Sequence, residues 1–81
     1  MKHATAKTLK SIEPLLKDIR RLLQKEKKIG IFYKGSGAYL HFHEDKKGIF
    51  ADVKVNNKWI RIKIPQNKKV WKRFVKKLLP P

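Results

Sequence analysis

The chain has 81 residues, of which 41% are hydrophobic and 35% charged, with 22 Lys and Arg against 6 Asp and Glu. This hydrophobic content supports one modest core and argues against disorder, and the absence of cysteine excludes a disulfide framework and a thiolate metal site. The formal charge of +16 favours a polyanionic partner, because self-repulsion on that scale weakens a compact fold unless it is neutralised.

The basic residues are concentrated toward the end of the chain. No residue after Asp52 is acidic, although the last 29 residues carry ten basic ones. Residues 1–10 are also basic and contain no apolar run, so we expect a flexible basic arm followed by a single α+β domain at residues 11–81. Without an apolar run of the required length, neither a secretory signal nor a membrane span is expected, which favours a cytoplasmic bacterial protein without a membrane partner.

A first helix is predicted from apolar residues that recur at helical spacing between Ile12 and Leu23. Pro14 fits only the first turn of a helix and disfavours helical geometry at Glu13, so the helix should begin near that point. We expect it to continue to about Lys27, because its basic end suits the negative pole of the helix dipole.

From residue 29 the apolar period changes to two, which is typical of strands. Asn56 and Asn57 interrupt the alternation and predict a two-residue hairpin loop. The expected strands are residues 29–34, 39–43, 49–55 and 58–64.

Pro65 ends the sheet, and the apolar spacing of residues 70–78 predicts a second amphipathic helix that stops before Pro80. The expected fold is therefore α+β, in the order helix, three or four antiparallel strands, helix, with both helices on one face of the sheet.

The hairpin loop also predicts the register of the sheet and hence its two faces. The inner face, which the helices should cover, contains the pairs Val53 with Ile60, Ala51 with Ile62 and Ile49 with Ile64. The opposite face, called the outer face below, carries three cross-strand rows: Tyr39–Lys54–Trp59, His41–Asp52–Arg61 and His43–Phe50–Lys63. The parity of the first strand stays open, because the turn at residues 35–37 can be counted as two or three residues.

The outer face combines aromatic and basic side chains, which could stack unpaired bases while the cations hold phosphates. The candidate residues are Tyr39, Lys54, Phe50, Trp59, Arg61 and Lys63, with Tyr33 as a further aromatic. Two alternatives remain open: the rings could pack on the stems of neighbouring Lys and Arg, or they could lie beneath the arm or a dimer partner.

The predicted second helix provides another basic surface. Lys68 and Lys69 occupy its first turn, where a bound phosphate would offset their unfavourable interaction with the helix dipole. No acidic residue interrupts the run, so no ion pair within the helix can form, although a plain solvated helix face is the alternative. The candidate phosphate ligands are Lys68, Lys69, Lys72, Arg73 and Lys76, with Lys77 continuing the charge.

The segment Gly-Ile-Phe-Ala-Asp-Val-Lys-Val-Asn-Asn-Lys at residues 48–58, followed by Lys-Lys-Val-Trp-Lys at residues 68–72, resembles the double-stranded-RNA-binding domain. The resemblance spans residues 48–77 and implies a helix, three antiparallel strands and a helix, with Lys68, Lys69 and Lys72 gripping phosphates across the major groove. The chain departs from the family at Trp71, where the family has a small Ala, and in lacking its Gly-Pro-x-His loop. Residues 39–55 are also similar to a family of small uncharacterised bacterial proteins, which implies no function.

His41 and His43 share a face at a spacing that some metal sites use. A third ligand would have to come from Glu44, Asp45 or Asp52, and the positive charge of the chain repels a cation. We therefore interpret these histidines as surface residues and predict no metal and no cofactor.

The sequence favours a small non-catalytic nucleic-acid-binding protein, with RNA preferred over DNA and affinity that falls with salt. One alternative is a metal-independent ribonuclease of toxin type, in which Asp52 orients His41 as a general base and Arg61 stabilises the phosphorane. The other is a protein-interaction module that binds an acidic partner through the aromatic face. The sequence leaves open whether the chain is a monomer or a homodimer.

Overall fold

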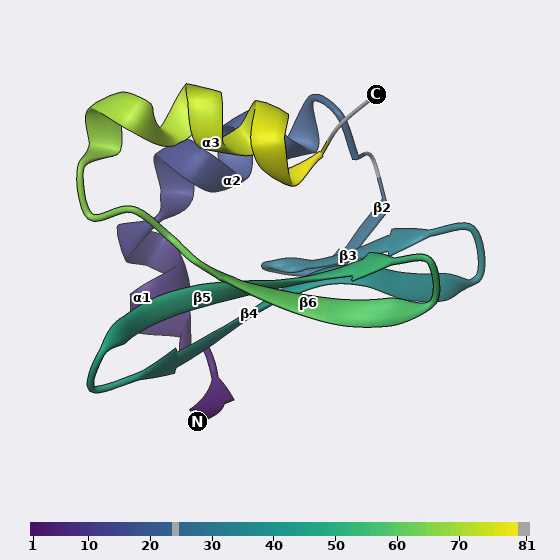
Figure 1. Ribbon diagram of the computed structural model, residues 1–81, viewed down its shortest axis with the longest axis horizontal. Helices are drawn as coiled ribbons and strands as arrows, with labels where there is room; N and C mark the ends of the chain where they lie inside the picture. The colour runs from purple at the N-terminus through teal and green to yellow at the C-terminus, as the bar shows by residue number, and fades with distance from the viewer. Residues whose placement is uncertain (24, 80–81) are drawn as a thin grey trace.

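The computed structural model describes residues 1–23 and 25–79 (Figure 1). Its strands form one antiparallel sheet in the order β2-β3-β4-β5-β6, and β1 pairs with β4. The α+β class is confirmed, whereas the prediction of three or four strands was too low. The first predicted helix is shortened to residues 13–20, and a further short helix at residues 6–11 lies within the predicted arm. In chain order the elements are β1 (Lys2–His3), α1 (Ala6–Ser11), α2 (Glu13–Arg20), β2 (Lys25–Lys28), β3 (Ile31–Lys34), β4 (Gly37–Asp45), β5 (Gly48–Val55), β6 (Lys58–Lys63), the 3-10 helix η1 (Lys68–Val70) and α3 (Trp71–Leu78).

Residues 1–10 are more regular than the arm expected from the sequence, since they contain β1 and most of α1. Thr5 caps α1, because its side chain accepts a hydrogen bond from the Thr8 backbone N–H at 3.2 Å. None of the residues of α1 is buried, so the apolar periodicity used to predict the first helix does not reach this segment.

The helix predicted to continue to Lys27 ends at Arg20. Pro14 occupies its first turn, as predicted. The following segment turns back as β2, and Gly30, with φ of +79°, allows the tight turn into β3. The prediction of a longer helix was wrong because the basic residues near Lys27 belong to an exposed edge strand rather than to a helix end.

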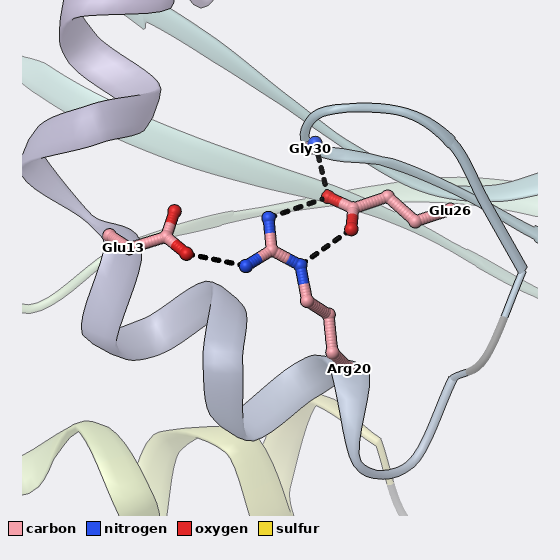
Figure 2. Close-up of polar contacts among 4 residues, drawn as sticks. All are labelled: Glu13, Arg20, Glu26 and Gly30. Carbon is pink, nitrogen blue, oxygen red and sulfur yellow. Dashed lines mark hydrogen bonds and ion pairs between the residues drawn. The ribbon is translucent and has the colours of Figure 1, made fainter.

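An ionic contact fastens α2 to the β2–β3 turn (Figure 2). Arg20 donates hydrogen bonds to both carboxylate oxygens of Glu26 and to Glu13, and Glu26 also accepts the Gly30 backbone N–H at 2.8 Å. Burial alone would raise the pKa of Glu26, but these hydrogen bonds outweigh it and hold that pKa below its ordinary 4.5.

The β5–β6 hairpin has the predicted loop and register. Asn56 and Asn57 have φ of 51° and 64°, the left-handed geometry that a two-residue hairpin loop requires. The pairs Val53–Ile60 and Ala51–Ile62 are formed as expected, and Ile64 donates its backbone N–H to Ile49 at 2.9 Å. On the outer face, the strand pairing confirms the rows His41–Asp52–Arg61 and His43–Phe50–Lys63 and the pair Lys54–Trp59.

Helices α2 and α3 lie on one side of the sheet, and within residues 1–23 and 25–79 no helix covers the other side (Figure 1). The core lies between the two layers, and it is built from the inner sheet face and the apolar sides of the helices. Its buried residues are Ile12, Leu15, Leu16, Ile19, Phe32, Leu40, Phe42, Ala51, Val53, Ile64, Trp71, Phe74, Val75, Leu78 and Leu79. Phe32 therefore settles the parity of the first predicted strand, with Tyr33 on the opposite side.

The helices do not cover the whole inner face, contrary to the prediction. Ile60 remains 43% exposed and Val55 40% exposed. The tip of the β5–β6 hairpin extends past the end of α3, and β6 is an edge strand, so these side chains lie outside the helical layer (Figure 1).

The second predicted helix is formed by η1 and α3. Asn67 caps η1 by accepting the Lys69 backbone N–H at 3.0 Å. Trp71 is buried and donates its indole N–H to the carbonyl oxygen of Pro65 at 2.7 Å. This bond fixes the start of α3 against the segment that follows β6, and it gives the buried Trp71 ring a polar partner.

Candidate functional site

The outer face of the sheet gathers the chain's histidines, a buried carboxylate and several aromatic and basic side chains. The face is open because the helices pack on the other side (Figure 1). Two of the three predicted rows are present, and of the third the pair Lys54–Trp59 is formed. Strand β1, which the sequence did not predict, places His3 opposite His43 and so extends the row His43–Phe50–Lys63.

Asp52 lies at the centre of this face and is only 5% exposed. Arg61 donates two hydrogen bonds to it, from Nε to Oδ1 at 2.7 Å and from Nη2 to Oδ2 at 2.8 Å. The hydrogen bonding from Arg61 holds the pKa of Asp52 below its ordinary value despite the burial that opposes this shift. Asp52 is therefore a carboxylate anion at neutral pH.

The histidine that contacts Asp52 is His43 and not His41, the residue assigned to it in the ribonuclease alternative. His43 Nδ1 lies 3.0 Å from Asp52 Oδ2, outside the angular range of a hydrogen bond, so we treat it as an electrostatic contact that a small ring rotation would convert into one. His41 Nδ1 is buried and has no hydrogen-bond partner among the described residues. The register thus places His41, Asp52 and Arg61 in one row, but no contact orients His41 as a base.

His3, His41 and His43 form a compact histidine cluster. Their ring centroids are 4.4 Å apart for His3 and His43, 4.9 Å for His41 and His43, and 5.8 Å for His3 and His41. Burial lowers the pKa of His41 and of His43, and charge repulsion from the neighbouring histidines adds to this effect at both, while Asp52 opposes it at both. The neutral imidazole is therefore favoured at both positions.

Sequence reasoning missed His3, because residues 1–10 carry no periodic signal. In the structure three contacts hold the segment against β4: the pairing of β1, the hydrogen bond from Ala4 N–H to the Phe42 carbonyl at 3.0 Å, and the one from Thr5 N–H to Glu44 Oε2 at 2.8 Å. The alternation along β4 already places His41 and His43 on one face, but a partner 38 residues away leaves no local signature.

Exposed aromatic surface lies beside the histidine cluster. Trp59 is 45% exposed, its ring lies 4.6 Å from that of His41, and Lys54 Nζ lies 5.8 Å from its centroid. Lys34 Nζ lies 5.1 Å from the Tyr39 ring farther along the same face. These cations lie above ring faces, as the packing alternative expects, but Trp59 keeps nearly half of its surface free.

The basic residues proposed for the second helix are all exposed in the structure. At the end of the sheet this helix approaches the outer-face cations, since Lys63 and Lys68 line the same hollow of about 290 Å³ together with Ile49 and Trp71. The two basic surfaces therefore meet at one end of the molecule. The exposed helix residues are Lys68, Lys69, Lys72, Arg73, Lys76 and Lys77.

The carboxylates of the chain are used internally, and arginine takes the ion pairs. Arg20 holds Glu13 and Glu26, Arg21 lies 3.7 Å from Asp18, and Arg61 holds Asp52. Glu44 and Asp45 accept hydrogen bonds from the Thr5 and Lys47 backbone N–H groups. Within residues 1–23 and 25–79, none of the 18 lysines forms an ion pair with a carboxylate.

Comparison with protein-family models, with curated proteins and with solved structures gave no match. The likeness to the double-stranded-RNA-binding domain therefore rests on the short motifs quoted above. Among the helices that the structure describes, none is long and apolar enough to cross a membrane.

Proposed function

We propose that this protein is a non-catalytic binder of single-stranded nucleic acid, with RNA favoured over DNA, and that the outer face is its binding surface. The observation that carries the proposal is the combination of an exposed Trp59 with lysines that no carboxylate neutralises among the described residues. Single-stranded binders use this combination of a stacking ring and a surrounding set of cations.

The open outer face favours single strands over a duplex. Bases stacked inside a duplex cannot reach rings on a sheet, whereas splayed bases can lie on them. Trp59 offers the largest exposed ring of this face, and Tyr39, which is half-buried, lines a hollow together with Lys54. One stacked base contributes about 1–3 kcal/mol, so Trp59→Ala should weaken binding by about 5- to 150-fold.

The cations around these rings supply the phosphate contacts. Lys54 pairs across the strands with Trp59, and Lys63 lies two rows farther along, near Lys68. A strand that runs across the face toward this end would meet phosphate ligands along its path. If about six phosphates are neutralised, log K for a single strand should fall with log salt at a slope of about −4.

The test is a fluorescence-anisotropy titration of a labelled oligouridylate, with the same sequence in DNA and an RNA duplex as competitors. Trp59→Ala should show the loss above, and Lys54→Ala should reduce the salt slope by about 0.7. The matched control is Lys72→Ala on α3, which removes an equal charge from the opposite side and should change affinity by less than about 3-fold.

The opposite pattern, in which Lys72→Ala weakens binding and Trp59→Ala does not, would move the interface to the helices and favour a duplex ligand. Binding that does not depend on salt, or no binding at all, would refute the proposal. Cleavage of the labelled RNA by the purified protein would replace it with the ribonuclease alternative.

A further inference from the structure

All three histidines of the chain meet on the outer face, although they come from β1 and β4 and are separated by up to 40 positions. One ligand nitrogen from each of His3, His41 and His43 lies within 4.8 Å of the other two. The proposed nucleic-acid binding makes no use of this arrangement, because none of the three histidines is among its stacking rings or phosphate ligands.

The spacing is close to that of a metal site. Three nitrogens that bind one zinc ion at about 2.0–2.1 Å in tetrahedral geometry lie about 3.3 Å from one another. Closing the present separation needs movements of about 1 Å or a little more, which rotation of the imidazole rings can provide. Each ring sits on a strand whose register is fixed by its neighbours, since His3 pairs with His43 and His41 pairs with Asp52.

Two features indicate that the cluster binds a cation and is not simply a group of three surface histidines. His41 Nδ1 is buried without a hydrogen-bond partner among the described residues, which is costly unless something binds it. His43 also has its Nδ1 3.0 Å from the carboxylate of Asp52. A carboxylate behind a histidine is the usual outer partner of a metal-binding imidazole, because it orients the ring and makes the other nitrogen more basic.

Asp52 is well prepared for that role. It is 5% exposed and is fixed in place by two hydrogen bonds from Arg61, so it supplies a permanent negative charge directly behind the cluster. The net charge of +16 already includes Asp52, but the structure places this carboxylate 3.0 Å from a ring of the cluster, where it attracts a cation at short range.

We propose that His3, His41 and His43 bind one divalent transition-metal ion of the class that prefers imidazole, such as Zn²⁺ or Co²⁺, with Asp52 as the outer partner of His43. Three protein ligands leave a coordination position for water or an anion on the exposed side of the sheet. The site should not prefer the hard cations Mg²⁺ and Ca²⁺, because these ions require oxygen donors. The evidence for the metal site does not rest on the proposed nucleic-acid binding.

The direct test is titration of the full chain with Co²⁺, followed by its visible d–d absorption, and competition with Zn²⁺. The chain has no cysteine and no other histidine, so any imidazole coordination of the metal must come from this cluster. We expect one Co²⁺ per chain with the intense absorption of a four- or five-coordinate site, displaced by Zn²⁺ and not by Mg²⁺.

Three variants locate the site. Asp52→Asn should weaken Co²⁺ binding by about 10- to 100-fold, the usual cost of losing an outer partner, and His3→Ala should cost more than that. Lys2→Ala is the matched control on the same strand: it removes an exposed side chain next to His3 and should change the affinity by less than about 3-fold. Because His3 is exposed, His3→Ala should fold even if Asp52→Asn does not, as circular dichroism will show.

Absence of Co²⁺ binding to the wild type would overturn the proposal. Equal affinities of His3→Ala and Lys2→Ala would also overturn it, because the metal would then not be held by the cluster. Binding that survives His3→Ala with an octahedral spectrum would point to ordinary surface carboxylates and would contradict the assignment.

Discussion

Arg20→Met tests whether the contact between α2 and the β2–β3 turn stabilises the fold (Figure 2). The substitution removes the charge and all three hydrogen bonds to Glu13 and Glu26. It keeps an unbranched side chain of similar helix propensity, so the effect should report the ionic contact and not the helix.

The expected loss follows from the surroundings of Glu26, whose side chain is only 17% exposed, whereas that of Arg20 is 32% exposed. A fully exposed ion pair contributes about 0.2–1 kcal/mol, and one hydrogen bond to a charged group about 1.5–3 kcal/mol. Discounting three such bonds for partial solvent screening, we expect the free energy of unfolding to fall by about 2–3 kcal/mol.

Urea denaturation followed by far-ultraviolet circular dichroism measures this loss, which should lower the midpoint by about 1–2 M. Arg21→Met is the matched control, because Arg21 is the next residue, its side chain is 77% exposed and its nearest carboxylate oxygen, on Asp18, is 3.7 Å away. It should lose less than about 0.5 kcal/mol. Equal losses for the two variants would refute the reasoning, since the stabilisation would then come from general charge effects and not from the contact with Glu26.

Three further predictions concern the same part of the fold and the hairpin. The pKa of Glu26 is lower in the folded state than its ordinary 4.5, so its contribution to the free energy of unfolding is present above pH 4.5 and is lost as the pH falls below that value. The free energies of unfolding of wild type and Arg20→Met should therefore differ less at about pH 3.5 than at about pH 7. Gly30→Ala should destabilise the fold by about 1 kcal/mol more than Gly35→Ala. Both glycines have positive φ, but only at Gly30 would the new methyl group lie 2.6 Å from a side-chain carbon. Equal urea midpoints of the two variants would contradict this. Asn57→Gly should raise the free energy of unfolding by about 0.5 kcal/mol, since φ of 64° costs glycine less, and a lower thermal midpoint would argue against it.

The C-terminal half of the fold could be predicted from the sequence, because its hairpin loop and its apolar spacing are visible over short stretches of the chain. The β5–β6 register follows from Asn56 and Asn57 together with strict alternation, and this pattern alone places Asp52 beside Arg61 and Lys54 beside Trp59, as the strand pairing confirms. The apolar spacing from Val70 to Leu78 likewise identifies α3 and its buried side.

The N-terminal half was less predictable for a physical reason. The sequence of β2, Lys-Glu-Lys-Lys, has no apolar residue, because it is an exposed edge strand held by backbone pairing and by the contact of Glu26 with Arg20. Helix α1 buries no residue and is marked only by its cap at Thr5. A hydrophobic pattern cannot reveal elements that bury no apolar side chain.

The candidate site divides in the same way. Alternation along β4 and β5 groups His41, His43 and Asp52 on one face, and the structure agrees. Side-chain geometry decides that His43 and not His41 contacts Asp52. The position of His3 depends on the long-range pairing of β1 with β4. Composition argues against a metal, and only these two features of the fold supply the third imidazole and the outer carboxylate that favour one.

The distribution of ion pairs connects the fold to both proposals. The guanidinium group of arginine is planar and can donate two hydrogen bonds to one carboxylate. Arg20 joins α2 to β2 in this way through Glu26, and Arg61 fixes Asp52, so these carboxylates are bound within the protein. The lysines are left to face solvent and whatever polyanion is present. Since the His41 ring lies 4.6 Å from that of Trp59, a dication at the histidine cluster would add positive charge beside the stacking surface. Metal binding and nucleic-acid binding must then strengthen each other, and by the same factor in both directions, because coupling between two binding equilibria is reciprocal.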